Sequence, residues 1–107
     1  MFGDLGNMMQ KLKESQQKVE ATKNRLNTVF LEGTSNHGAV KVSISGNREI
    51  KSIDIADDLL TDKDALEDYL ILALNDAIEK ASKLQEAELA AVAKEGLPSI
   101  PGLDQFM

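Results

Sequence analysis

The chain has 107 residues, a size that fits one domain, and 18 acidic against 12 basic side chains give it a formal net charge of −6. The absence of cysteine excludes disulfides and thiolate chemistry, and a single histidine excludes a metal site that needs two. The acidic balance argues against a generally basic nucleic-acid-binding protein. No run of apolar residues is long enough to span a membrane, and the N-terminus lacks the pattern of a signal peptide. We therefore expect a soluble, intracellular protein.

The charge is unevenly distributed along the chain. Residues 1–30 carry five bases and three acids, a net charge of +2. Residues 61–107 carry four bases and ten acids, a net charge of −6. This asymmetry points to a polyanion-binding segment near the N-terminus, but solvated helix faces that differ by chance would produce it as well.

Residues 4–30 are predicted to form one long helix, since they contain no proline and no glycine after Gly6. Apolar residues recur there at seven-residue spacing, while Ser15 and Thr22 occupy the companion positions that a stable coiled coil would fill with apolar side chains. We expect a narrow apolar stripe that is anchored at both ends and weakly buried between them, on a helix that projects from the body or makes one shallow contact with it. The stripe consists of Leu5, Leu12, Val19 and Leu26.

Residues 28–56 change to a two-residue period, which is typical of strands. Apolar and polar residues alternate over 40–45, Gly46 and Asn47 indicate a turn, and a second strand follows over 53–55. Ile50 has the wrong parity for that strand, which predicts a bulge near residues 51–52 or an Ile50 side chain on the other face of the sheet. With a third strand over 29–34, joined through a loop at residues 35–38, the pattern predicts a three-stranded antiparallel meander.

Residues 62–95 are predicted to form a second long helix. Thr61 or Asp62 can cap its start, and Gly96 followed by Pro98 ends it. The fold class is therefore α+β with the element order α-β-β-β-α. We expect a single domain over residues 1–96 and a flexible tail with glycine and proline over residues 97–107.

The second helix is apolar nearly all round between Leu70 and Ile78. A helix of this kind is buried on all sides, and one short chain has too little material to surround it. This predicts a homodimer, with the alternative that Leu72 is an isolated exposed leucine. The predicted interface residues are Leu70, Ile71, Leu72, Leu74 and Ile78.

The sequence offers no support for an enzyme. His37 stands alone in a predicted polar loop, and no phosphate-binding loop, dinucleotide fingerprint or nucleophile elbow is present. The acidic residues between Asp57 and Asp64 do not follow the ligand spacing of a calcium loop. We expect no catalytic residue, no metal, no cofactor and no small-molecule substrate.

A basic stripe runs along the first helix, because Lys11, Lys18 and Arg25 recur every seven residues, with Lys13 and Lys23 on the same helix. Such a helix can lie along phosphates, which are contacted without reading the sequence. An ordinary solvated face would give the same spacing. The scarcity of aromatic residues argues against a platform that stacks the bases of single strands.

The stretch from Gly38 to Gly46, the segments 53–55 and 59–62, and the helical segments 66–70 and 73–77 resemble the YbaB/EbfC family of bacterial nucleoid-associated proteins. The N-terminal Met1-Phe2-Gly3 and the glycine- and proline-containing end are also similar. The resemblance implies a homodimer with projecting helices. It also implies a cytoplasmic, nucleoid-associated function: binding double-stranded DNA with low sequence specificity, altering its conformation and affecting gene expression, without enzymatic activity or a membrane.

Two hypotheses follow from the sequence and the resemblance together. In the first, the first helix of each protomer contacts DNA phosphates, and the acidity of the second helix argues against a DNA-binding role for that helix. The proposed contacts are Lys11, Lys18, Lys23 and Arg25, with Lys13 assisting. In the second, the chain is a dimeric protein-interaction or adaptor module that does not bind DNA directly.

Overall fold

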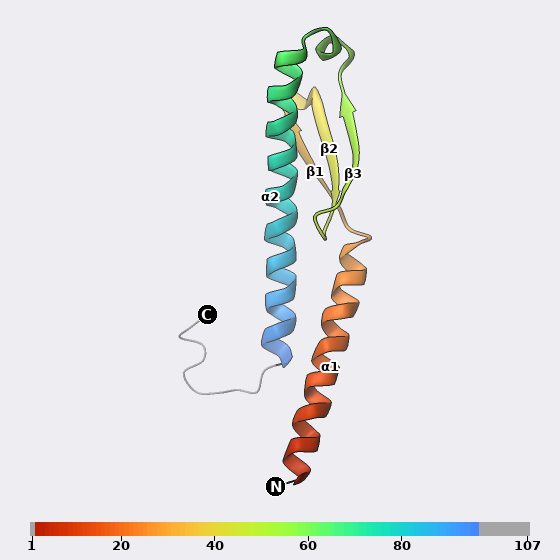
Figure 1. Cartoon of the computed structure of the whole chain (residues 1–107), viewed down its shortest axis with the longest axis vertical. Helices are drawn as coiled ribbons and strands as arrows, with labels where there is room; N and C mark the ends of the chain where they lie inside the picture. Colours follow the sequence, from red (N-terminus) through yellow and green to blue (C-terminus); the bar gives the residue numbers. More distant parts are fainter. Residues whose placement is uncertain (1, 97–107) are drawn as a thin grey trace, which may run out of the picture.

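The computed structural model describes residues 2–96, which form two long helices and one sheet in the predicted order (Figure 1). The expected tail over residues 97–107 lies outside the described residues. The elements are α1 (Phe2–Leu26), β1 (Phe30–Ser35), η1 (Asn36–Gly38), β2 (Val40–Ser45), β3 (Ile50–Ile55), η2 (Asp57–Thr61) and α2 (Lys63–Gly96).

The sheet is an antiparallel meander with the strand order β1-β2-β3, as predicted. Ser43 pairs with Ser52 and Ile44 pairs with Ile50, so Lys51 is the extra residue of a bulge in β3. This confirms the irregularity expected from the parity of Ile50. Because of the bulge, Ile50 and Ile53 both lie on the face of the sheet that α2 covers.

The core forms where α2 crosses the sheet. The side chains of Val40, Val42 and Ile44 on β2 are fully buried, as are three alanines of α2 spaced four residues apart, Ala73, Ala77 and Ala81. Gly33 of β1 brings the two layers into close contact, since a Cβ atom there would lie 2.4 Å from the backbone oxygen of Ala73. Asp62 caps α2 by accepting a hydrogen bond from the backbone N–H of Ala65 at 3.2 Å.

A single helix covers β1 and β2 but leaves much of β3 open. Ile53 is 45% exposed to solvent and Ile50 is 39% exposed, although both lie on the side of the sheet that faces α2. The protomer therefore has uncovered apolar side chains on β3, beside α2.

The helix α1 lies end to end with the sheet along the same side of α2 (Figure 1). It is shorter than predicted, because residues 27–29 already turn toward β1 and Phe30 pairs with Ser45. Thr22 and Leu26 are buried, and Ser15 and Val19 are half-buried, so these four residues mark the side of α1 that faces α2.

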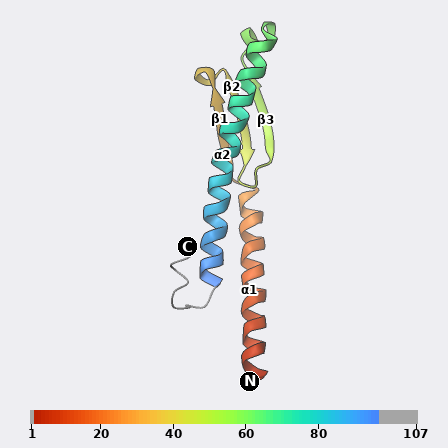
Figure 2. The ribbon, with the colours of Figure 1, turned by 60° about the vertical axis from the view of Figure 1, so that its left-hand side comes forward.

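The N-terminal half of α1 extends beyond the end of α2 (Figure 2). Leu5 and Leu12 are consequently exposed, at 60% and 62% of their surface. The prediction that the apolar stripe is anchored at both ends is thus wrong: only its Val19–Leu26 half packs against the body, since α2 ends before it reaches Leu12.

Candidate nucleic-acid interface

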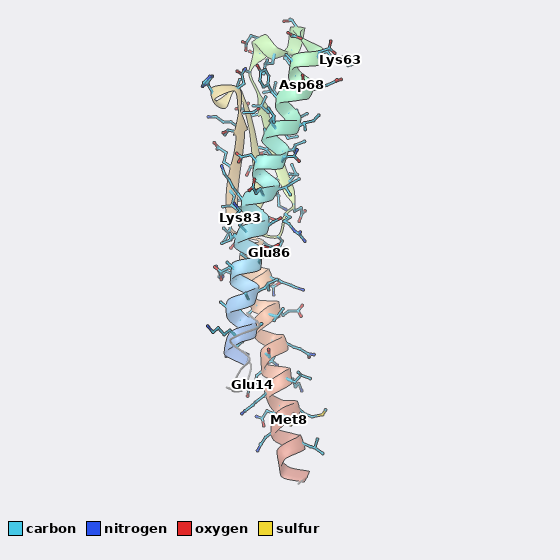
Figure 3. All side chains as sticks on the ribbon, turned by 90° about the vertical axis from the view of Figure 1, so that its left-hand side faces the viewer. Met8, Glu14, Lys63, Asp68, Lys83 and Glu86 are labelled. Carbon is cyan, nitrogen blue, oxygen red and sulfur yellow. The ribbon has the colours of Figure 1, made fainter. Side chains whose placement is uncertain are left out.

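Residues 5–26 of α1, here called the arm, carry most of the basic side chains that are exposed and form no ion pair among the described residues. The arm holds five bases and two acids, a net charge of +3, whereas residues 27–94 hold seven bases and thirteen acids, a net charge of −6. The free end of the arm, with Met8 and Glu14, lies at the opposite end of the molecule from Lys63 and Asp68 (Figure 3). The fold thus separates a basic arm from an acidic body.

Four lysines of the arm point into solvent. Their side chains are exposed, and within the described residues no carboxylate lies close enough to form an ion pair with any of them. The four are Lys11, Lys13, Lys18 and Lys23. Lys11 and Lys18 share one side of the helix about 10 Å apart along its axis, at a rise of about 1.5 Å per residue.

Arg25, the third member of the predicted basic stripe, is placed differently. Its guanidinium Nη2 lies 2.6 Å from Oε2 of Glu88 on α2, so this base bridges the two helices. The ion pair is partly exposed, with 53% of the Arg25 side chain accessible. The structure therefore leaves Lys11 and Lys18 exposed on one side of the arm and holds Arg25 at the junction between arm and body.

The arm also carries an exposed apolar stripe that periodicity alone assigned to packing. Its members follow the i, i+3, i+4, i+7 spacing of one helix face. They are Leu5, Met8, Met9 and Leu12, each at least 60% exposed.

The predicted dimer residues of α2 fall into two groups. Leu70 and Leu74 are half-buried and pack against the core of their own chain, whereas Ile71, Leu72 and Ile78 are exposed at 56%, 58% and 42%. Sequence reasoning missed Ile50 and Ile53, whose exposure becomes apparent only when one helix is placed across three strands.

Asp76 and Lys80 mark the side of α2 that faces β1. The carboxylate Oδ2 of Asp76 accepts the backbone N–H of Thr34 at 3.0 Å, and Lys80 Nζ donates to that same oxygen and to the backbone oxygen of Glu32. The hydrogen bond from Thr34, followed by the Lys80 ammonium, holds the pKa of Asp76 below its ordinary value of 3.8.

The angle around the axis of α2, measured from Asp76, shows on which side of the helix each exposed residue lies. At about 100° per residue, Ile71 and Ile78 lie roughly 140–160° around α2 from Asp76, on the side of β3. Leu72 lies about 40° from Asp76, on the side of β1. Ile71 and Ile78 therefore lie on the same side of α2 as the uncovered Ile50 and Ile53.

The described part of the chain shows neither a metal-binding cluster nor a membrane-spanning helix. Within it, no three His, Asp or Glu side chains gather in a way that would hold a metal ion, and His37 is exposed in η1. Among the same residues, no helix is both long and apolar enough to cross a membrane.

Comparison with known proteins places these features in context. The model of the YbaB/EbfC DNA-binding family matches residues 1–97. A nucleoid-associated protein of Flavobacterium johnsoniae is 54% identical over 103 residues, covering 96% of this chain and 97% of the relative. A nucleoid-associated protein of Bordetella avium is 35% identical over 104 residues, covering 96% and 95%. The crystal structure of an uncharacterized protein from Helicobacter pylori superimposes with a TM-score of 0.77 at 26% identity, covering 87% of this chain and 97% of that one.

Proposed function

Because the chain belongs to the YbaB/EbfC DNA-binding family, we propose that it binds double-stranded DNA at the nucleoid, in the cytoplasm, as a homodimer with low sequence specificity. The family is defined by DNA binding, and the chain is accordingly a nucleoid-associated protein and not an enzyme. The observation that carries the assignment of the interface is the separation of a basic arm from an acidic body.

The arm suits contact with phosphates more than with bases. Lysines are flexible point charges, and their contacts fix a protein on the duplex without reading the sequence. Lys11 and Lys18 supply the central contacts, Lys13 and Lys23 flank them, and Arg25 contributes when it leaves Glu88. The acidic body is repelled by the same phosphates, so DNA lies along the arm and away from the sheet.

The homodimer in this proposal follows from the uncovered apolar side chains of β3 beside α2. Ile50 and Ile53 of β3 and Ile71 and Ile78 on the β3 side of α2 are all exposed, and we name these four residues the isoleucine patch. A second copy that places its own patch here buries all eight side chains around a two-fold axis. Leu70 and Leu74 support the patch from the core, and Leu72 joins the interface where the partner reaches around α2.

A dimer with two projecting arms contacts DNA at two places. Two contacts held at a fixed separation favour those paths of the duplex that bring phosphates to both arms. This is how binding would alter DNA conformation and thereby gene expression.

The arm assignment is tested with paired variants of equal charge. We expect Lys11→Gln with Lys18→Gln to weaken binding to a random-sequence duplex at least tenfold, measured by fluorescence anisotropy. The control combines Lys51→Gln and Lys63→Gln, which removes the same charge from the acidic body and should change the affinity little. Equal losses in the two variants would show that net charge, and not the arm, governs binding.

The dimer is tested by light scattering. The unmodified chain should have a mass of about twice 11.7 kDa, and Ile78→Asp should shift it toward the monomer because it would place an unpaired charge in the interface. An Ile78→Asp protein that remains a dimer would refute the isoleucine patch. Leu72→Asp tests the β1 side of α2 separately. If the Leu72→Asp protein remains a dimer, the interface is confined to the β3 side.

The exposed apolar stripe of the arm favours a second candidate function, a dimeric adaptor that binds a protein. A pull-down from nuclease-treated extract distinguishes the two functions. Protein partners that stay bound without nucleic acid, together with no affinity for purified duplex, would support the adaptor.

A further inference from the structure

We propose that the turn between β2 and β3, and above all Asn47, is a positioning element that fixes the direction in which the arm projects. The inference rests on the proposed function in one respect, namely that the arm contacts DNA. Asn47 touches no DNA in this account; it acts through the placement of the lysines on α1.

The turn binds the carbonyl groups at the end of α1. The backbone N–H of Gly46 donates to the backbone oxygens of Leu26 at 3.0 Å and Val29 at 2.9 Å. The last carbonyls of a helix lack N–H partners within the helix. Here the backbone oxygen of Leu26 accepts the N–H of Val29 at 3.2 Å, and the distant turn supplies a second donor to it. A Cβ at residue 46 would lie 2.9 Å from both Cδ2 and the backbone oxygen of Leu26, so the close approach requires glycine.

The side chain of Asn47 joins three elements at this point. Its Nδ2 donates to the backbone oxygen of Lys23 at 2.7 Å and to Oδ1 of Asn27 at 2.6 Å. Its Oδ1 accepts Nε2 of Gln85 from α2 at 3.4 Å. Both hydrogens of the amide and its oxygen are thereby used, which also fixes the orientation of the amide.

The turn is itself held firmly to the sheet. The Oγ of the fully buried Ser45 accepts the backbone N–H groups of Asn47 and Glu49 at 3.2 and 3.3 Å. The backbone N–H of Ser45 donates to the oxygen of Glu49 at 2.8 Å. Because the turn is held rigidly to the sheet, its contacts with α1 fix the orientation of α1 relative to the sheet.

The packing of α1 against α2 is too sparse to set the direction alone. On the side of α1 that faces α2, Leu26 is the only fully buried apolar side chain within the described residues, and the other positions are Val19, Ser15 and Thr22. The two helices are also joined by the partly exposed ion pair between Arg25 and Glu88, a type of contact that contributes little. The hydrogen bonds of the turn therefore carry much of the orientation.

A small tilt at this junction would move the lysines far. Lys11 lies 15 residues from Leu26, or about 22 Å along the helix at about 1.5 Å per residue. A tilt of roughly 15° would displace Lys11 by about 6 Å, which exceeds the 3.4 Å rise per nucleotide of a DNA strand. Two arms of a dimer match one duplex only if both tilts are fixed.

The test uses an isosteric change. Asn47→Asp keeps the shape but replaces the Nδ2 donor with an oxygen that faces the oxygens of Lys23 and Asn27. Asn24→Asp is the matched control, because it adds the same charge at an exposed position of α1 next to Lys23. The chain has no cysteine, so Gln17→Cys and Glu79→Cys can be spin-labelled in the full-length protein, and excess unlabelled chain isolates distances within one protomer.

We expect Asn47→Asp to broaden and shift the distance distribution between the two labels, measured by double electron–electron resonance, and Asn24→Asp to leave it unchanged. Affinity for duplex DNA should fall on the order of tenfold in Asn47→Asp relative to Asn24→Asp, since two neutral hydrogen bonds are lost. The slope of log affinity against log salt should match that of Asn24→Asp, because the same lysines reach the phosphates once bound.

Two outcomes overturn the inference, and a third overturns only the proposed function. An unchanged distance distribution in Asn47→Asp means that packing alone orients the arm. A broadened distribution with the affinity of Asn24→Asp means that arm direction does not matter for binding. If the lysine substitutions of the arm leave affinity intact while the distances change, the proposed function fails and the positioning role of Asn47 remains. Circular dichroism verifies folding, and Asn47→Ala, which removes the donors without adding charge, carries the same expectations if Asn47→Asp is unfolded.

Discussion

Replacing Gly33 with alanine tests the close approach of β1 and α2 on which the body of the molecule depends. The added Cβ would lie 2.4 Å from both the backbone oxygen of Ala73 and the backbone nitrogen of Ala77, and 2.6 Å from the Cβ of Ala77. These are backbone atoms of a helix and the first atom of a side chain, so no rotamer change relieves the contact. To restore an ordinary separation of about 3.4 Å, α2 must move away from the sheet by about 1 Å.

Such a movement loosens the packing of Ala73, Ala77 and Ala81 against β2. Overpacking of a core costs about 1–3 kcal/mol, and displacement of a helix with three fully buried alanines places this case at the upper end, about 3 kcal/mol. The loss is a large share of the 5–15 kcal/mol that stabilises a typical domain. Far-UV circular dichroism during urea denaturation, at one fixed protomer concentration, gives the free energy of unfolding.

Gly6→Ala is the matched control, because a Cβ at that position of α1 meets nothing within 4 Å. Alanine favours a helix over glycine by about 1 kcal/mol, so the control should be neutral or slightly more stable. If Gly33→Ala unfolds at the same urea concentration as the unmodified protein, α2 does not lie against β1 as described and the close approach is refuted.

Two further substitutions probe single contacts. Because the folded-state pKa of Asp76 lies below 3.8, this carboxylate stabilises the fold above about pH 4, and its contribution is lost as the pH falls through the lowered pKa. Asp76→Asn should therefore cost about 1 kcal/mol at pH 7 in thermal unfolding, and the cost should shrink as the pH falls below 4; a cost that does not change with pH would contradict the charged contact with Thr34. Glu88→Gln should strengthen DNA binding severalfold in anisotropy by releasing Arg25, whereas unchanged or weaker binding would show that Arg25 takes no part.

Much of the fold follows from local patterns in the sequence. The two-residue alternation over 40–45 and the three alanines at four-residue spacing specify which faces of β2 and α2 meet. Ile50 breaks the alternation, which predicts either a bulge or a side chain on the other face, and the register of β2 with β3 shows the bulge at Lys51.

The parts that could not be predicted depend on how far one element reaches along another. The heptad spacing of Leu5 and Leu12 looks the same whether or not a partner helix extends that far, and α2 does not. The ion pair between Arg25 and Glu88 joins residues 63 apart in sequence, so spacing within α1 gives no sign of it. The exposure of Ile53 likewise could not be predicted, because it arises only when one helix, which is too narrow to cover three strands, lies over β1 and β2.

The salt dependence of DNA binding tests the central claim most directly. If Lys11, Lys18 and Lys23 of both protomers neutralise six phosphates, log affinity should fall against log salt with a slope of about −5, at about −0.9 per phosphate. Lys11→Gln combined with Lys18→Gln removes four of those contacts and should bring the slope to about −2. A slope near zero in the unmodified protein, or a steep slope that the two substitutions leave unchanged, would contradict binding through the basic arm.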